Sequence, residues 1–164
     1  MKKTNRFELL KVLLCLLLVM VMVLPPMPAS GQTSTKTYRD ATGGFLNETT
    51  FLAAAAYTTS NNTITPIDIG GYDVGIIIIN VTAISGTSPS LTVNFMGCDS
   101  APGTQTIPAN SACGIHTAST AITATGVYFV KVDHLTRFAT VQTVITGTSP
   151  SFTMDIRGQF KTSV

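Results

Sequence analysis

The chain of 164 residues contains no tryptophan, only two histidines and few charged side chains, which make up 11% of the sequence. Few ionisable groups leave little material for a catalytic site, because acid–base chemistry needs converging titratable side chains. The nucleophile motif Gly-x-Ser-x-Gly is absent. Without tryptophan, and with its four tyrosines scattered along the chain, the sequence does not favour an aromatic platform for sugars. We expect a non-enzymatic protein with no cofactor and no metal.

Positive charge is scarce outside the N-terminal segment 1–31. This segment holds four of the ten lysines and arginines, so the remainder of the chain, 32–164, carries six basic and seven acidic side chains. Six positive against seven negative charges give that remainder a formal charge of −1. It has no basic patch to neutralise phosphates, and we expect no nucleic-acid partner. Its length suits one domain.

An apolar run follows this basic start. It extends from Val12 to Leu24 and ends at two prolines. A spanning helix needs about 20 apolar residues, so the run has the length of a signal peptide. Ala29 and Gly31 are small residues at positions −3 and −1 of a cleavage site before Gln32. We predict a signal peptide over residues 1–31, membrane contact only through this transient segment, and a secreted, extracellular or cell-surface location. An uncleaved anchor is the alternative.

Export determines how the remaining cysteines are interpreted. Cys98 and Cys113 form an even pair in a protein expected to meet an oxidising compartment, which predicts a disulfide. The bridge would close the loop between them and stabilise the fold by about 3 kcal/mol on the chain-entropy model. Asp99 and His116 lie near these cysteines in sequence, but the spacing matches no standard zinc pattern.

Beyond Asn62 the sequence pattern is that of β-structure, while the alanine-rich stretch 51–57 is ambiguous and is interpreted as a first strand or a short extended arm. Stretches rich in Val, Ile, Thr and Phe alternate with Gly, Pro, Ser and Asn, and no useful amphipathic helical stretch occurs. We predict a flexible polar arm over 32–50, followed over 51–164 by an all-β domain, an antiparallel two-sheet β-sandwich of jelly-roll-like type. About eight strands are expected, over 51–57, 63–69, 74–84, 90–96, 118–123, 126–133, 136–145 and 151–160.

An internal repeat carries Gly-Thr-Ser-Pro twice, from Gly86 to Pro89 and from Gly147 to Pro150. Glycine can take positive φ, and proline suits a turn or the first residue of a strand. We therefore predict a β-hairpin with a short loop at each copy. After each turn apolar and polar side chains alternate, which places these apolar residues in the core: Leu91, Val93, Phe95, Phe152, Met154 and Ile156.

The strand before the first copy contains four consecutive isoleucines, Ile76, Ile77, Ile78 and Ile79. They do not alternate with polar residues. The strand is therefore predicted either to be covered on both faces or to present its outer face to another protein. The second alternative makes these isoleucines a possible interface.

Two small polar groups are the other candidates for chemistry. Asp133 and His134 are adjacent, and we interpret them as solvated turn residues. Asp68 and Asp73 flank two glycines, where their carboxylates could bind backbone, water or Ca²⁺. Too few acidic residues gather there to predict a metal site.

Several short motifs follow one another along the chain between residues 51 and 160. They are Gly-Gly-Tyr72, Val81-Thr82-Ala83, Ser85-Gly-Thr-Ser-Pro-Ser-Leu-Thr-Val93, Ala124-Thr-Gly126, Arg137 and Thr146-Gly-Thr-Ser-Pro-Ser-Phe-Thr153. In this order they resemble small, mostly uncharacterised phage and prophage virion-type proteins. The resemblance implies a β-sandwich that acts as a structural or accessory virion subunit.

These observations favour a secreted structural subunit that self-associates or decorates an extracellular or virion-like assembly. The mechanism that we expect is edge-strand pairing, in which residues 32–57 add a strand to a neighbouring subunit. The alternative is a monomeric extracellular binding module, an adhesin or carbohydrate binder, that uses the disulfide-closed loop 98–113 for recognition.

Overall fold

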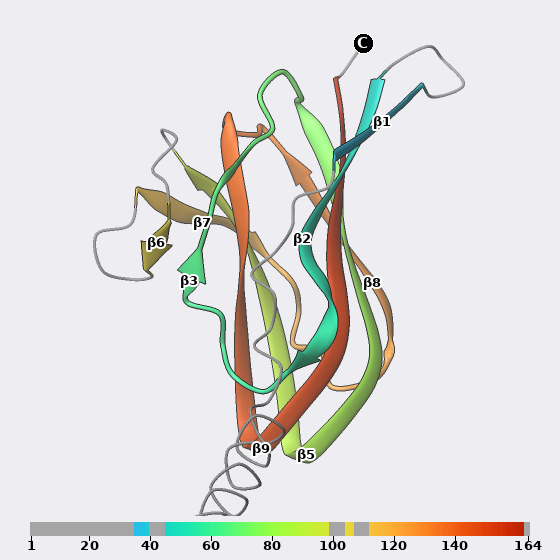
Figure 1. Cartoon of the computed structure of the whole chain (residues 1–164), viewed down its shortest axis with the longest axis vertical. Coiled ribbons are helices and arrows are strands. Elements are labelled where there is room, and N and C mark those ends of the chain that lie inside the picture. The colour runs from blue at the N-terminus through green and yellow to red at the C-terminus, as the bar shows by residue number, and fades with distance from the viewer. Residues whose placement is uncertain (1–34, 40–44, 99–103, 107–111, 163–164) are drawn as a thin grey trace, which may run out of the picture.

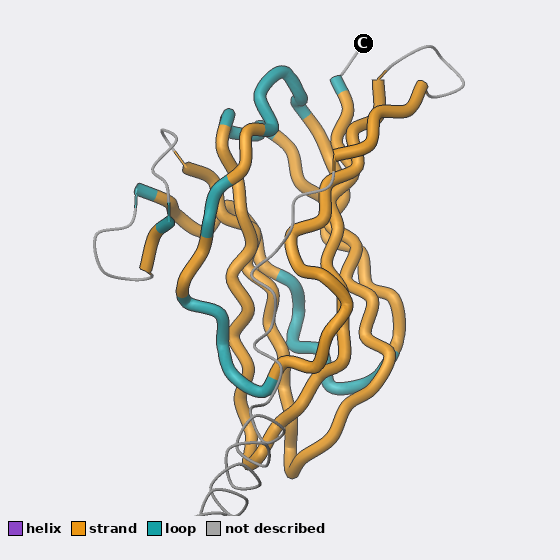
Figure 2. Tube along the Cα trace, viewed as in Figure 1, coloured by secondary structure: helices purple, strands orange, loops and turns teal. Residues whose placement is uncertain are grey.

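The computed structural model describes residues 35–39, 45–98, 104–106 and 112–162. These ranges contain nine β-strands and no helix, which confirms the predicted all-β class (Figure 2). A helix that could cross a membrane is accordingly not found among them. The predicted signal peptide, residues 1–31, lies outside the described residues.

The nine strands pair in two groups, and every pairing is antiparallel. Seven form one sheet, while the short β3 and β6 pair only with each other. The predicted two-sheet, jelly-roll-like β-sandwich is therefore not confirmed. The strands are β1 (Thr35–Arg39), β2 (Phe45–Tyr57), β3 (Thr63–Ile64), β4 (Ile67–Asp68), β5 (Val74–Cys98), β6 (Gln105–Thr106), β7 (Cys113–Ala118), β8 (Gly126–Asp133) and β9 (Phe138–Lys161) (Figure 1).

Two long strands organise the main sheet. β5 has 25 residues and β9 has 24, and they pair from Val74 opposite Lys161 to Cys98 opposite Phe138. The first part of β5 and the last part of β9 are flanked by β8 and β2, with β1 beyond β2. We call this part the β8 half. The other parts of β5 and β9 are flanked by β7 and β4 and form the β7 half.

The two Gly-Thr-Ser-Pro segments lie in the middle of these strands and face each other, with Thr87 opposite Thr148. The predicted hairpins are therefore wrong, because the residues on either side of each segment pair with the other long strand and not with each other. Gly86 and Gly147 do take positive φ, 107° and 122°, and the pairing register shifts on both sides of Thr87. A bulge needs the same residues as a turn, and it bends a strand without ending it. Figure 1 shows β5 and β9 bending together at one end of the molecule.

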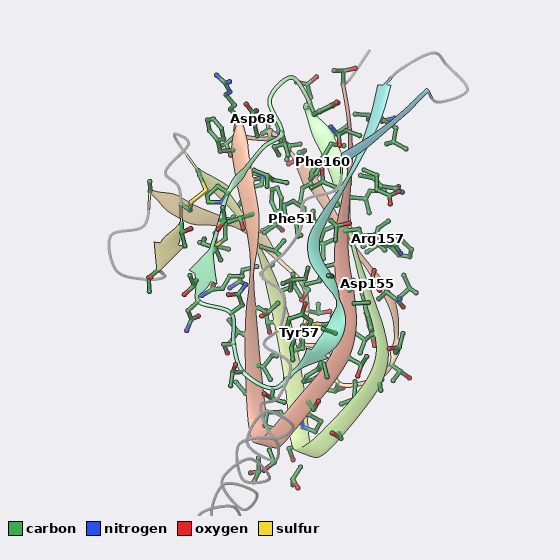
Figure 3. All side chains as sticks on the ribbon, in the orientation of Figure 1. Phe51, Tyr57, Asp68, Asp155, Arg157 and Phe160 are labelled. Carbon is green, nitrogen blue, oxygen red and sulfur yellow. A yellow bond between two sulfur atoms is a disulfide. The ribbon has the colours of Figure 1, made fainter. Side chains whose placement is uncertain are left out.

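The bend folds the sheet until its two halves face each other. Phe95 of β5 lies 6.3 Å, between ring centroids, from Phe160 of β9, and the pairing partner of Phe160 is Gly75, near the start of β5. A straight strand from Gly75 to Phe95 would span about 66 Å, at about 3.3 Å per residue, so β5 must double back. Phe51 of β2 contacts both rings edge-on, with ring centroids 6.2 Å from Phe95 and 6.1 Å from Phe160. Figure 3 shows Phe51 beside Phe160.

The core lies between the two halves. The six side chains predicted to be in the core from their alternation are each at most 2% exposed, which confirms that prediction. The rings of Phe51, Phe95 and Phe160 belong to the same cluster. Aromatic pairs of this kind contribute about 0.5–1.5 kcal/mol beyond the apolar area that they bury.

Some strand bounds differ from those predicted. Gly126–Asp133 is a strand as expected. Of the predicted strand 118–123, only Ala118 lies in a strand, at the end of β7, and Ile122 makes only an isolated bridge to Leu91. Residues 63–69 contain two short strands separated at Pro66, which cannot donate a ladder hydrogen bond. The sheet also starts earlier than expected, because Thr35–Arg39 and residues 45–50 of the predicted arm are paired strands.

Candidate assembly surface

The four isoleucines alternate in burial although they do not alternate in sequence. Ile77 and Ile79 are 1% and 0% exposed and point into the core, while Ile76 is 42% exposed and Ile78 is half-buried on the outer face. Coverage on both faces, the first of the two sequence alternatives, therefore does not hold for Ile76. Its side chain is available to another molecule.

The neighbouring edge strand extends this outer surface. In β8, Val127 and Phe129 are 52% and 67% exposed, whereas Tyr128 and Val130 pack against the core. The register places Phe129 opposite Ile78, so the outward side chains of the two strands are neighbours on one surface. We call the outward side chains of Ile76, Ile78, Val127 and Phe129 the apolar face.

A polar band borders the apolar face on β9 and β2. Arg157 lies opposite Ile78 in the pairing register, and its Nε donates to Asp155 Oδ2 at 3.0 Å (Figure 3). Arg157 Nη1 also lies 3.8 Å from Glu48 Oε1, and Asn80 Nδ2 donates to Asp155 Oδ1 at 2.8 Å. Because the Arg157 side chain is 41% exposed, solvent screens these pairs and they contribute little to stability. The surface thus has an apolar centre and a polar rim.

The corresponding face of the β7 half is covered by the chain itself. Ile64 of β3 packs with Met96 and the two disulfide cysteines in a second buried cluster. Beside this cluster, Asn94 Nδ2 donates to Gln142 Oε1 at 2.9 Å, and Gln142 Nε2 donates to Asn62 Oδ1 at 3.0 Å. The two halves therefore differ, since the chain covers most of the outer side of the β7 half, where Ile115 is exposed, and leaves a group of apolar side chains exposed on the β8 half.

The two outer edges of the β8 half also differ. β8 pairs only with β5 within the described chain, and its register is constant from Val74 opposite Asp133 to Val81 opposite Gly126. At the other edge, residues 45–57 are already paired with β9, and β1 pairs with part of them. The strand that we expected the arm to donate is therefore used inside the subunit.

The predicted disulfide is present. Cys98 and Cys113 lie opposite each other in the ladder between β5 and β7, with an Sγ–Sγ distance of 2.06 Å. The bridge closes the base of the loop that we considered as a recognition surface. Residues 99–103 and 107–111 of that loop lie outside the described residues.

A polar hollow of about 530 Å³ lies at the end of the sheet where β4 and β9 meet. Asp68 accepts hydrogen bonds there from Arg137 Nε at 3.2 Å, Arg137 Nη2 at 3.0 Å and the Gly70 N–H at 2.8 Å. The Arg137 bonds, and then the Gly70 N–H, hold the pKa of Asp68 below its usual value. The described residues contain no group of three or more His, Cys, Asp or Glu side chains placed to hold a metal ion.

Asp133 and His134 are exposed at the end of β8. His134 Nδ1 lies 3.4 Å from Asp133 Oδ1, and the side chains of His134 and Asp133 are 93% and 59% exposed. The backbone carbonyl of Asp133 contacts Nε2 of His116 on β7 at 2.6 Å. This placement agrees with their interpretation as solvated residues at a turn.

Comparisons with known proteins give little further information. No family model matches the chain, and no curated protein matches it. One solved structure that matches comes from work titled "Bacillus endospore appendages form a novel family of disulfide-linked pili". The two chains share 16% identity over 86% of this chain and all of the other, with a TM-score of 0.35. A TM-score this low supports no functional inference.

Proposed function

We propose that this chain is a secreted, non-enzymatic structural subunit that self-associates in an extracellular or virion-like assembly. One observation carries the proposal. The outer surface of the β8 half exposes three large apolar side chains, Ile76, Val127 and Phe129, by 42–67%, whereas the chain covers most of the outer surface of the β7 half with its own residues and leaves only Ile115 exposed among its large apolar side chains. Contiguous exposed apolar side chains with a polar rim are typical of protein interaction sites.

Burial of these side chains would supply a useful driving force. Transfer of apolar surface out of water contributes about 25 cal/mol per Å², and one large side chain contributes about 1.5–3 kcal/mol when fully buried. Side chains already half-buried in the subunit would contribute correspondingly less. Association between copies would therefore be favourable but dependent on concentration, since binding also costs translational and rotational freedom.

The test is the mass of the protein in solution. We would express the full chain through an export pathway and measure its mass by light scattering after size exclusion, over a series of concentrations. We expect oligomers whose population rises with concentration and falls in the variant Ile76→Lys. The matched control is Ile115→Lys, since Ile115 is 60% exposed but belongs to β7. A strict monomer at every concentration would overturn the proposal.

The second candidate function is a monomeric binding module, and the disulfide at the base of loop 98–113 is the observation that favours it. The double variant Cys98→Ser and Cys113→Ser distinguishes the two. An assembling subunit should lose stability and keep its ability to associate once folded. A binder should lose its ligand, because the disulfide would no longer hold the two ends of the loop together.

A further inference from the structure

We infer that two copies of this chain join through β8, whose edges pair antiparallel around a two-fold axis so that the main sheet continues from one copy into the other. This inference rests on the proposed function and specifies the contact. It uses the edge of β8 together with the apolar face beside it.

The edge of β8 lacks most of the features that normally keep a strand from pairing with another molecule. Natural edges are protected by bulges, prolines, short length or charged side chains, lysine above all, and of these β8 has only Lys131 and Asp133, at its C-terminal end. β8 has eight residues, contains no proline, and keeps one register against β5 without a shift. β7, the edge strand of the other half, has a register shift between Phe95 and Met96 of its partner strand. β7 approaches β8 at the Asp133 end. From Gly126 to Lys131, β8 pairs with β5 on one side and has no second strand partner in the described chain on its other side.

Both sides of this edge offer apolar contacts to an added strand. Val127 and Phe129 project outward and are more than half exposed. Tyr128 and Val130 project inward, where they are only partly buried against the core. A strand paired with β8 would therefore cover side chains on both faces, in addition to making main-chain hydrogen bonds.

The order of charges along β8 favours a second, antiparallel copy as the added strand. The outward side chains are Val127, Phe129, Lys131 and Asp133, so apolar residues come first and charges follow. With the axis at Phe129, the two Phe129 rings are cross-strand neighbours, and each Lys131 lies opposite Val127 of the partner. The lysine stem covers that valine, and its ammonium group can approach the partner's Phe129 ring. A parallel arrangement would instead place Lys131 against Lys131 and Asp133 against Asp133, which is repulsive.

The contact is small, which determines the behaviour to expect. An interface limited to one strand edge and its side chains lies at the low end of interface sizes, at roughly 1,200 Å² or less. The dimer should therefore be reversible, and its population should rise with protein concentration.

Amide hydrogen exchange on the wild-type full chain, measured at low and high concentration, tests the pairing directly. Within residues 126–131 alternate amides point away from β5. We expect these amides to exchange more slowly at high concentration, because they would donate to the partner strand. If the protein associates and these amides exchange at an unchanged rate, β8 pairing is wrong while self-association stands.

Variants provide the second test. Phe129→Lys places like charges at the axis and should weaken dimerisation by about tenfold or more, whereas Ile115→Lys should leave it unchanged. Circular dichroism establishes whether each variant is folded, and the exchange experiment on the wild type decides the question if Phe129→Lys is not. Dimerisation of folded Phe129→Lys at the wild-type affinity would overturn the inference alone. A protein that is monomeric at all concentrations would overturn both the inference and the proposed function.

Discussion

Replacement of Gly86 by alanine tests the bend that folds the sheet. Gly86 has a φ of 107°, which side chains rarely tolerate. A Cβ at this position would lie 2.6 Å from the Ser149 carbonyl oxygen and 2.9 Å from Pro150 Cα. Both atoms belong to the backbone of the paired segment of β9, so they cannot move aside as the end of a flexible side chain could.

The magnitude follows from these two effects. A non-glycine residue in a sparsely populated backbone conformation costs about 1–3 kcal/mol, and an atom forced into a filled space costs about 1–3 kcal/mol. Gly86→Ala should therefore lower the free energy of unfolding by about 2–6 kcal/mol, the sum of the two costs. Gly147→Ala should cost less, because the nearest atoms to its Cβ lie at 2.9 and 3.0 Å. Gly114→Ala, which has no atom within 4 Å of its Cβ, should change stability by no more than about 0.5 kcal/mol.

Urea unfolding followed by far-ultraviolet circular dichroism measures all three variants, with the disulfide kept intact. The midpoint should fall most for Gly86→Ala, less for Gly147→Ala and hardly for Gly114→Ala, with the slope unchanged. If Gly86→Ala and Gly114→Ala unfold at the same urea concentration, the two long strands do not meet at Gly86 with the close approach described above.

Three further predictions concern other parts of the fold. Reduction of the Cys98–Cys113 disulfide should lower the free energy of unfolding by about 3 kcal/mol, as urea titrations with and without reductant would show; an unchanged midpoint would contradict this. The lowered pKa of Asp68 means that its pairing with Arg137 stabilises the fold above the usual aspartate pKa of about 3.9, and this contribution is lost as pH falls through the folded-state value. The unfolding midpoints of wild type and Asp68→Asn should therefore converge in acid, and a constant difference would refute this. Burial, and then the charge of Asp155, raise the pKa of Tyr57, so its contribution is complete below about pH 10 and is lost as pH rises further; Tyr57→Phe should reduce the alkaline loss of stability, and equal losses would argue against it.

The fold could be predicted where the local pattern had one structural meaning. Residues 126–133 are rich in valine and aromatic side chains, which favour strands, and they form β8 with the expected limits. The alternation after each Gly-Thr-Ser-Pro segment identified Phe95 and Phe152 as core residues, and both are buried. The pairing of Cys98 with Cys113 followed from the expected export and the even count, without knowledge of the fold.

The two Gly-Thr-Ser-Pro segments could not be interpreted from local sequence. A glycine at positive φ and a proline without an N–H suit both a tight turn and a bulge in a continuing strand. Long-range pairing decides between them, since in the structure Thr87 pairs with Thr148 and not with a residue of its own hairpin. The repeat itself was the available signal, because two equivalent segments in one chain can lie side by side.

The candidate surface depends on the same long-range arrangement. A run of four isoleucines indicates burial, and Ile77 and Ile79 are indeed buried. Ile76 is exposed because no segment of the described chain fully covers the outer face of β5 at this position. No property of the isoleucine run itself distinguishes that outcome from a covered strand.

The difference between the two halves is what connects the fold to the proposed function. The two copies of the repeat lie in β5 and β9 and pair with each other, so each half of the sheet contains part of both copies. From the repeat alone, the outer faces of the two halves are expected to be similar. Residues 60–65 lie over one of them, where Asn61 bridges to Thr143 and Ile64 completes a buried cluster with Met96. The other face has no such segment in the described chain, and its edge strand, β8, has no strand partner there other than β5.

A subunit that is covered on one side and open on the other has one preferred contact. A contact that pairs with itself around a two-fold axis produces a closed dimer. Growth into a longer assembly would then require a second, different surface, and the β1 edge, which pairs only with β2 among the described strands, is the other open edge of the β8 half.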